Sequence, residues 1–359
     1  MMISEKLLSI IVPSYNMEAY LAKNISSMMV QDEALRQRVE VIVVNDGSRD
    51  RTSEIAHDFA ERCPGCITVI DKPNGHYGSC INAALPVAKG KYIRVLDADD
   101  YADKEVFERF LSFLSDVANE DELDLVISDI CHVDPDGKIT AQTKYNLPKD
   151  ASFTLNSIAD WFTDFVGLHA ITYRTLMLRE MNYRQTEGCA YTDTEWFIVP
   201  MTRVRKVRYF NQVVMCYLVG RDGQTMQPEI FERDFGVVIK IFEGIVRLWP
   251  QLDKDATKDA RGYIQALLER KVYWLYRFVL LSKRLAHLND ALKVFDSTLK
   301  AEMPLFYEKC SIETTPSRKF NFKYIKVWRK SYTTKTVLFS LYYGYVALLQ
   351  RFYKLRGVK

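Results

Sequence analysis

The sequence has little that marks a secreted or membrane-spanning protein. Its first residues lack the basic start, apolar stretch and small-residue cleavage site of a signal peptide. No run approaches the roughly 20 apolar residues of a spanning helix. The 359 residues are 48% hydrophobic and 26% charged, which suits one large core with an appended second unit. We therefore expect a cytoplasmic location.

Cysteine patterns that hold metals or disulfides are also missing. The seven cysteines show no paired zinc-ligand spacing and no disulfide framework. Cys63-Pro64-Gly65-Cys66 is the one C-x-x-C, and we interpret it as a loop before a strand rather than a redox or metal site.

Glycine-rich phosphate loops are absent too. The first predicted strand is not followed by G-x-G-x-x-G, the dinucleotide-binding fingerprint, and the chain has no G-x-x-x-x-G-K-[ST] loop. Any diphosphate that this chain binds must therefore be held by side chains and a metal.

Acidic residues are missing from the last part of the chain. Residues 314–359 contain 11 Lys and Arg and no Asp or Glu, whereas residues 1–313 contain 38 basic and 46 acidic residues. This basic tail also holds Trp328 and ten Phe or Tyr residues. We expect peripheral contact with an anionic membrane surface, the inner face of the cell membrane. The alternative is a basic amphipathic helical pair packed on the body. No nucleic-acid-binding motif accompanies the charge, so nucleic acid is not an expected partner.

Strand and helix patterns alternate through the first 130 residues. Five apolar runs predict strands, and four segments of helical periodicity lie among them. This alternation favours an α/β fold with a mostly parallel sheet flanked by helices. The predicted strands are Leu7–Val12, Val39–Val44, Ile67–Ile70, Tyr92–Leu96 and Leu123–Ile127, and the predicted helices are Ala19–Val30, Thr52–Arg62, Ser79–Ala88 and Lys104–Val117.

The pattern changes after residue 130. A less regular region runs to about residue 226, and helical spacing without strand signals follows in Phe231–Leu248, Ala256–Ser282 and Leu288–Lys300. We predict one domain over residues 1–226, with halves at 1–130 and 131–226. A helical C-terminal region over 227–359 follows and includes the basic tail.

Polar clusters follow four of the predicted strands at one edge of the sheet. Tyr92–Leu96 ends in Asp97-Ala98-Asp99-Asp100, and residues two apart in extended chain point the same way, so Asp97 and Asp99 can present oxygens to one point. Such ligands suit Mn²⁺ or Mg²⁺. The same spacing in Asp134-Pro135-Asp136 has no such strand context and is interpreted as a turn. The other clusters are Pro13-Ser14-Tyr15-Asn16, Asn45-Asp46-Gly47-Ser48 and Lys72-Pro73-Asn74-Gly75.

A site built from these loops suits a nucleotide diphosphate. Tyr15 offers an aromatic face for a base, Asp46 offers a carboxylate for a base N–H, and the aspartates can hold a metal on the phosphates. Each residue also has an ordinary explanation, namely packing for Tyr15, an Asp-Gly turn for Asp46 and a plain loop for Asn74-Gly75.

These four clusters, in this order over about 100 residues, resemble family 2 glycosyltransferases. The resemblance implies a GT-A fold over roughly Leu7 to Arg221, and inverting transfer from a nucleotide-diphosphate sugar, expected to be a UDP-sugar. It places the donor base against Pro13, Tyr15 and Asp46, the ribose near Asp97 and the metal on Asp99. The remaining residues expected on the donor side are Ser14, Asn74, Gly75, Ser79, Asn82 and Ala98.

Glycosyl transfer also requires a base for the acceptor hydroxyl. The segment Cys189 to Phe197 resembles the acidic acceptor-side motif of the family, although Thr192 replaces its first acid. Asp193 matches the aspartate that acts as general base in the family, and Glu195 and Trp196 are expected on the acceptor side. The structural alternative for Asp193 is the N-cap of a helix over residues 194–202.

Arg221 and His169 are further candidates. Arg221 stands where related enzymes place a loop over the diphosphate, and its guanidinium suits phosphate, although a surface salt bridge is the alternative. His169 would face the acceptor, whereas a hydrogen-bonded structural histidine is the ordinary explanation.

Two other functions suit a similar sheet. A sugar nucleotidyltransferase would normally carry G-x-G-T-R where Pro13-Ser14-Tyr15-Asn16 stands. A noncatalytic, membrane-associated nucleotide-sugar-binding protein would have no need of all four carboxylates at Asp46, Asp97, Asp99 and Asp193. We therefore expect a metal-dependent enzyme. If the basic, aromatic tail lies on the inner membrane surface, a glycan or lipid-linked glycan acceptor in cell-surface polysaccharide synthesis is the expected partner.

Overall fold

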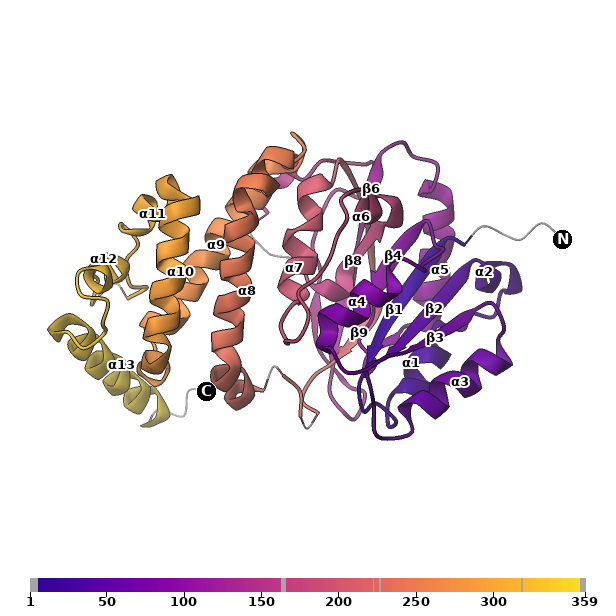
Figure 1. The fold of residues 1–359 in the computed structure, drawn as a ribbon, viewed down its shortest axis with the longest axis horizontal. Helices are drawn as coiled ribbons and strands as arrows, with labels where there is room; N and C mark the ends of the chain where they lie inside the picture. The colour runs from indigo at the N-terminus through magenta and orange to yellow at the C-terminus, as the bar shows by residue number, and fades with distance from the viewer. Residues whose placement is uncertain (1–5, 163–165, 222, 226, 318, 356–359) are drawn as a thin grey trace. The chain divides into compact units, whose positions relative to one another are not determined.

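A computed structural model describes residues 6–162, 166–221, 223–225, 227–317 and 319–355 (Figure 1). The chain divides into two compact units. The first comprises Met1–Gln227 and Asp255–Ile264, and the second comprises Pro228–Lys254 and Gln265–Lys359. No helix in the described part of the chain is long and apolar enough to cross a membrane.

The first unit alternates strands and helices as far as residue 117 and becomes less regular afterwards. Its strands are β1 (Leu8–Ser14), β2 (Val39–Asn45), β3 (Ile67–Asp71), β4 (Tyr92–Val95), β5 (Tyr101–Ala102), β6 (Leu123–Val133), β7 (Ile139–Thr143), β8 (Ile171–Arg174) and β9 (Lys206–Leu218). Its helices are α1 (Leu21–Met28), α2 (Glu33–Gln37), α3 (Thr52–Arg62), α4 (His76–Ala84), α5 (Lys104–Val117), α6 (Thr175–Glu180) and α7 (Asp193–Ile198).

Among the described residues, nine strands form one sheet in the order β3-β2-β1-β4-β8-β6-β9-β5, with β7 paired to β6. The half made of β3, β2, β1 and β4 is parallel, as expected. The other half is mixed, because β8 runs antiparallel to both β4 and β6 while β9 runs parallel to β6. The α/β fold is therefore confirmed, and the expectation of a mostly parallel sheet is wrong for this second half.

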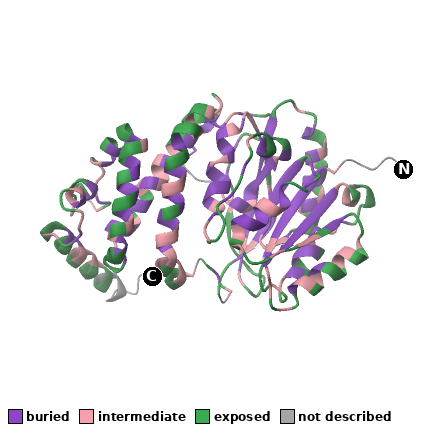
Figure 2. Ribbon diagram, viewed as in Figure 1, coloured by how far each residue is buried: buried purple, intermediate pink, exposed green. Residues whose placement is uncertain are grey.

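Helices cover the parallel strands because both faces of these strands are apolar. Leu8, Ile10 and Val12 of β1 lie in one core with residues of α1, α3 and α5. Helix α4 contacts β1 and β2 and lies in front of them in Figure 1. Figure 2 shows the strands as almost continuously buried. This packing fixes the strand ends, from which the polar loops extend.

Helix ends show where local signals were sufficient. Asp103 caps α5 as its sequence position suggests, and its side chain accepts from the N–H of Val106 at 3.0 Å. Asp193 is the first residue of α7 and not its N-cap, which is Thr192.

The second unit is helical over the residues described. Its helices are α8 (Pro228–Asp255), α9 (Arg261–Leu280), α10 (Asn289–Glu302), α11 (Pro304–Cys310), α12 (Tyr324–Arg329) and α13 (Val337–Leu355). Aromatic contacts join them, such as the stacked rings of Phe235 and Phe278, whose centroids are 4.4 Å apart. The buried ion pair of Arg329 with Asp296, at 2.7 Å, fastens α12 to α10.

Candidate active site

The ends of β1, β2 and β3 bring their polar loops together. The strands are in parallel register, with Ser14 opposite Asn45 and Asn45 opposite Asp71. The N–H of Asp46 then donates to the carbonyl of Ser14 at 2.8 Å, which ties the first two loops to each other. Loops that are far apart in sequence thus meet at the carboxyl edge of the sheet, where α/β sheets bind ligands.

The buried carboxylate of Asp46 is held through one of its two oxygens. Its Oδ1 accepts from Nζ of Lys72 at 2.6 Å, from the N–H of Gly75 at 2.9 Å and from Oγ of Ser79 at 3.5 Å. The side chain of Asn74 donates to the Asp46 carbonyl at 3.0 Å. Three predicted donor-side residues, Asn74, Gly75 and Ser79, therefore position Asp46. The second oxygen, Oδ2, remains as an acceptor for a ligand.

Tyr15 stands at the rim beside Asp46. The residue is 43% exposed, and an exposed aromatic ring can stack on a ligand. The turn is fixed by Asn16, which has a φ of +54° and accepts from the N–H of Arg49 at 2.9 Å. Pro13 is half-buried, and Ser14 is buried with its hydroxyl donating to the carbonyl of Val12 at 3.2 Å, so Ser14 supports this turn from below.

The aspartates after β4 have separate partners. Tyr77 of α4 donates its hydroxyl to Oδ1 of Asp97 at 2.8 Å. Nε of Arg221 lies 2.5 Å from Oδ2 of Asp99, and the guanidinium also lies over the ring of Tyr20. Ala98 between them is buried. Arg221 thus bonds to the predicted metal ligand and is no surface salt bridge, since its side chain is only 16% exposed.

Asp100 points into the protein. It is 1% exposed, and its Oδ1 accepts from the N–H of Leu218 in β9 at 2.8 Å. Its Oδ2 lies 2.7 Å from Nε2 of His169 in an ion pair that is not aligned as a hydrogen bond. Burial opposes a charge on His169, but Asp100 and Asp97 outweigh it and raise the pKa of the imidazole. Asp100 therefore ties the loop after β4 to β9.

His169 is a structural residue in this arrangement. Its ring stacks on Tyr217 with centroids 4.6 Å apart, and its side chain is 12% exposed. The buried guanidinium of Arg94 donates to its carbonyl. These contacts favour the ordinary explanation of His169 over a contact with the acceptor.

Asp193 lies in the second half of the first unit and contributes to the electrostatics of the residues around Asp97. It begins α7, directly after a turn in which Tyr191 has a φ of +63°. Burial raises the pKa of Tyr217, and the carboxylates of Asp100, Asp97, Asp99 and Asp193 raise it further, in that order. Burial and then Asp97 also raise the pKa of Tyr77, with a smaller contribution from Asp193. The charge of Asp193 therefore contributes to the raised pKa of Tyr217 and of Tyr77, as the charge of Asp97 does.

The segment 185–188 joins α4 to α7. Asn82 of α4 donates to the carbonyl of Gln185 at 2.8 Å and accepts from its N–H at 2.9 Å. Glu195 of α7 accepts from the N–H and the hydroxyl of Thr186, at 2.7 and 2.6 Å. A Cβ added at Gly78 would lie 2.0 Å from the Thr186 carbonyl, so only glycine allows this approach. Asn82 and Glu195 therefore position this bridge.

Trp196 lies in the core. It is fully buried between Tyr173 and Tyr183, with centroids 5.3 and 5.8 Å away. This burial leaves no surface of Trp196 for an acceptor, and packing explains the residue.

Several site residues were not singled out from the sequence. Tyr77 and Lys72 hold Asp97 and Asp46. Lys72 belongs to the cluster after β3 but was given no role of its own, and Tyr77 stands two residues after Gly75, where a wider window would have found it. Asn24 donates to the carbonyls of Asp97 and Asp100 at 2.9 Å each; its signal is a polar residue on the buried face of α1.

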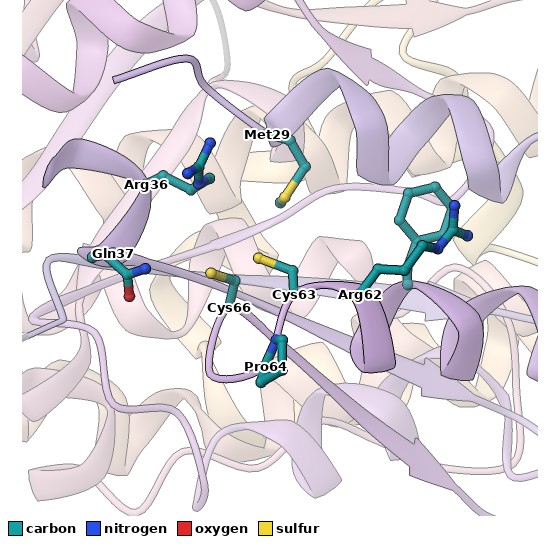
Figure 3. Close-up of a pocket in the computed structure, with 8 residues that line it drawn as sticks. Met29, Arg36, Gln37, Arg62, Cys63, Pro64 and Cys66 are labelled. Atoms are coloured by element: carbon teal, nitrogen blue, oxygen red, sulfur yellow. The ribbon is translucent and has the colours of Figure 1, made fainter. Parts of the chain in front are cut away.

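The Cys63–Cys66 segment is the predicted loop before β3 and lines a separate cavity of about 470 Å³ (Figure 3). Gly65 makes the turn with a φ of +80°. Burial and then Cys66 raise the pKa of the Cys63 thiol, which keeps it in the less reactive protonated form. Nothing in this geometry favours redox chemistry.

The aspartate cluster is suited to a hard divalent cation. Ligand atoms of Asp97, Asp100 and His169 lie within 4.8 Å of one another. Asp100 and His169 neutralise each other in the interior, whereas the side chain of Asp97 is 30% exposed and that of Asp99 is 8% exposed. A guanidinium already lies against Asp99, which marks this position as one that accepts positive charge. Carboxylate oxygens are the ligands that Mn²⁺ and Mg²⁺ prefer.

The mixed sheet with its flanking helices has a GT-A type of fold. The likeness extends to TarS of S. aureus, solved with UDP-GlcNAc, at a TM-score of 0.65 and 19% identity over 84% of this chain and 82% of that one. Residues 9–181 match the family described as Glycosyl transferase family 2, and this region of the chain belongs to that family.

Two curated relatives share this region. An uncharacterized glycosyltransferase of Bacillus subtilis, EpsJ, is 40% identical over 120 residues, which are 33% of this chain and 33% of EpsJ. Chondroitin synthase of Pasteurella multocida is 33% identical over 217 residues, which are 59% of this chain and 20% of the synthase. The chain thus aligns with a third of one relative and a fifth of the other.

Proposed function

We propose that this protein is a metal-dependent inverting glycosyltransferase that moves a sugar from a UDP-sugar to a glycan or lipid-linked glycan. The observation that carries the proposal is the connection between two sets of carboxylates. Asp97 follows β4 and is bonded by Tyr77 of α4, and segment 185–188 joins α4 to α7, which begins at Asp193. This chain of bonds supports a donor site and a candidate base that act together.

The donor base would lie against Tyr15 and Asp46. The accessible ring of Tyr15 would stack on the base, and Oδ2 of Asp46 would accept the N3–H of uracil. Lys72, Gly75 and Ser79 hold Oδ1 and so fix the direction of Oδ2. The ribose hydroxyls would approach Asp97, whose orientation is set by Tyr77.

The transfer is a single displacement at the anomeric carbon. The acceptor oxygen forms the new glycosidic bond, the bond to the UDP oxygen breaks, and the acceptor proton moves to the carboxylate of Asp193. The attack on the opposite face inverts the configuration. Arg221 lies beside Asp99 and would contact the diphosphate as negative charge develops on it.

Asp99, with Asp97, would hold Mn²⁺ or Mg²⁺. When bound, the ion supplies positive charge to the leaving diphosphate. In its absence the charge of Asp99 is balanced by Arg221.

The acceptor is proposed by analogy. Chondroitin synthase and the minor teichoic acid biosynthesis protein GgaB of Bacillus subtilis are among the relatives, and they support a role in cell-surface polysaccharide synthesis. A lipid-linked glycan would be met at the cytoplasmic face of the cell membrane, where we place the protein.

A donor-hydrolysis screen tests this proposal. The intact protein with Mn²⁺ would be incubated with UDP-, GDP- and dTDP-sugars, and release of the nucleoside diphosphate would be measured. We expect the wild-type protein to release UDP from a UDP-sugar and the Asp193→Asn protein to release none. Binding of nucleotide-sugars without release in any acceptor mixture would instead favour a noncatalytic binding protein, and formation of nucleotide-sugar from a sugar phosphate would favour a nucleotidyltransferase.

A further inference from the structure

The last helix exposes an apolar face. In α13, Val337, Leu341 and Leu348 are 75%, 55% and 66% exposed, and Leu338 beside them is 39% exposed. Spacings of four and seven residues place the first three on one side of a helix. Figure 2 shows exposed residues along this helix.

The opposite face of α13 is fixed to its own unit. Phe339 is fully buried with its ring 5.3 Å from that of Phe322, and Tyr342 is 6% exposed. The hydroxyl of Tyr343 donates to the carbonyl of Leu280 at 2.7 Å. The leucine face is therefore outward because the other face is already packed, and the helix is not merely displaced from a core.

Exposed cations stand on both sides of this face in the sequence. The described part of residues 314–351 contains no acidic residue, and its exposed basic residues make no ion pair within the described chain. Arg329, in contrast, is spent on the buried pair with Asp296. The exposed cations are Lys319, Lys323, Lys326, Lys330, Lys335 and Arg351.

We propose that the exposed face of α13 and these six cations form a surface that binds an anionic lipid bilayer. The leucines would enter the boundary between headgroups and acyl chains, and the cations would contact lipid phosphates. A second copy of the chain fits this surface less well, because a twofold interface would bring the same uncompensated cations together. The proposal extends the proposed function, whose lipid-linked acceptor would lie at such a bilayer.

Vesicle flotation of the full-length protein tests the surface. Vesicles of phosphatidylcholine alone would be compared with vesicles containing about one third phosphatidylglycerol, at low and high salt. We expect binding to the anionic vesicles, reduced at least about tenfold by high salt, since charge attraction to lipid is screened. Equal binding to neutral vesicles would overturn the role of the cations.

Two sets of substitutions separate the apolar and charged parts. Leu341→Gln with Leu348→Gln removes the apolar face, and Lys326→Gln with Lys330→Gln and Lys335→Gln removes three charges. Each set is expected to lower binding by about tenfold or more. The matched controls Leu305→Gln and Lys240→Gln change exposed residues of α11 and α8 and should bind as the wild type does.

Binding of UDP by the same variants distinguishes this inference from the proposed function. Both sets should retain wild-type UDP affinity in calorimetry. Unchanged vesicle binding by both sets, with UDP affinity retained, would overturn the inference alone. A dimer that only Leu341→Gln with Leu348→Gln dissociates, in a protein that ignores vesicles, would show that a second copy covers the face instead.

Discussion

The two halves of the sheet use polar side chains differently. At the ends of β1 and β2, Tyr15 is 43% exposed, and the bonds from Lys72 and Gly75 to Asp46 use Oδ1 alone. In the half made of β8, β6 and β9, polar side chains are buried and paired, as with Asp129 of β6, whose Oδ1 accepts from the hydroxyl of Tyr209 at 2.5 Å. One half therefore offers groups to a ligand, whereas the other uses its polar groups for internal bonds.

The border between these roles runs between two adjacent residues. Asp99 faces Arg221 at the rim, whereas Asp100 faces His169 and Leu218 in the interior. The chain turns at this point, with the N–H of Asp100 donating to the carbonyl of Asp97 at 3.0 Å, and the turn gives the two carboxylates different environments. Composition at a strand end does not reveal function until the direction of each side chain is known.

Asp193→Asn should break the catalytic link between the halves and have the largest effect. The amide cannot take the acceptor proton, so we expect kcat to fall about a thousandfold. The Kd for UDP should stay within about threefold by calorimetry, because Asp193 is expected to contact the acceptor. Asp290→Asn, in the first turn of α10, is the matched control and should leave kcat unchanged. Loss of UDP binding in a folded Asp193→Asn protein would count against the assignment.

Asp100→Ala tests the buried bonds that join the loop after β4 to Leu218 and His169. The change leaves the Leu218 N–H and a buried imidazolium without their acceptor, and losing one partner of a buried pair costs about 3 kcal/mol. Urea unfolding should show this loss. Asp100→Asn keeps an acceptor for Leu218 and should lose less. An unchanged unfolding midpoint for Asp100→Ala would show that these bonds of Asp100 do not stabilise the fold.

Gly78→Ala tests the bridge between the halves. The added methyl group would meet the Thr186 carbonyl at 2.0 Å, so segment 185–188 must move, at a cost of about 2 kcal/mol. We expect both lower stability and lower kcat, because the same segment holds Glu195 close to Asp193. Gly244→Ala, whose Cβ would meet no atom within 4 Å, should stabilise α8 slightly. Similar behaviour of both variants would refute a specific contact.

Asp99→Ala tests the proposed metal site. We expect UDP affinity in Mn²⁺ to fall about tenfold and affinity in EDTA to change little, because only the metal-dependent part of binding is lost. Calorimetry with and without Mn²⁺ measures both. Asp136→Ala changes the second aspartate of an exposed turn with the same spacing and is the control. A fall of equal size in EDTA would argue against Asp99 as a metal ligand.

Cys63→Ser should have the smallest effect. Cys63 lies in the turn between α3 and β3, outside the loops that carry Asp46 and Asp97. The free energy of unfolding should therefore change by less than about 0.5 kcal/mol. Activity should also be equally sensitive to peroxide in both proteins. Protection by the serine would restore a redox role for the C-x-x-C.

The sequence predicted the parallel half well because its signals are local. Each apolar run of β1, β2, β3 and β4 is followed at once by the polar residues that it positions. The mixed half was harder, since β8 has only four residues and follows a short 3-10 turn at 168–170. Its polar partners are also distant in sequence: the bond from Leu218 to Asp100 spans 118 residues. No local pattern signals such a pair.

The bridge at 185–188 has a consequence for how this protein can change. Because Asn82 and Gly78 of α4 and Glu195 of α7 hold the same short segment, a substitution that moves α7 is expected to displace α4 and hence Ser79 and Asp46. If α7 serves the acceptor and Asp46 the donor, as we propose, the two sites are coupled through this segment. Acceptor preference and donor affinity are then not independent traits. Directed evolution toward a new acceptor should yield variants with altered donor KM even when no donor contact is mutated, and reversion at 185–188 should restore it.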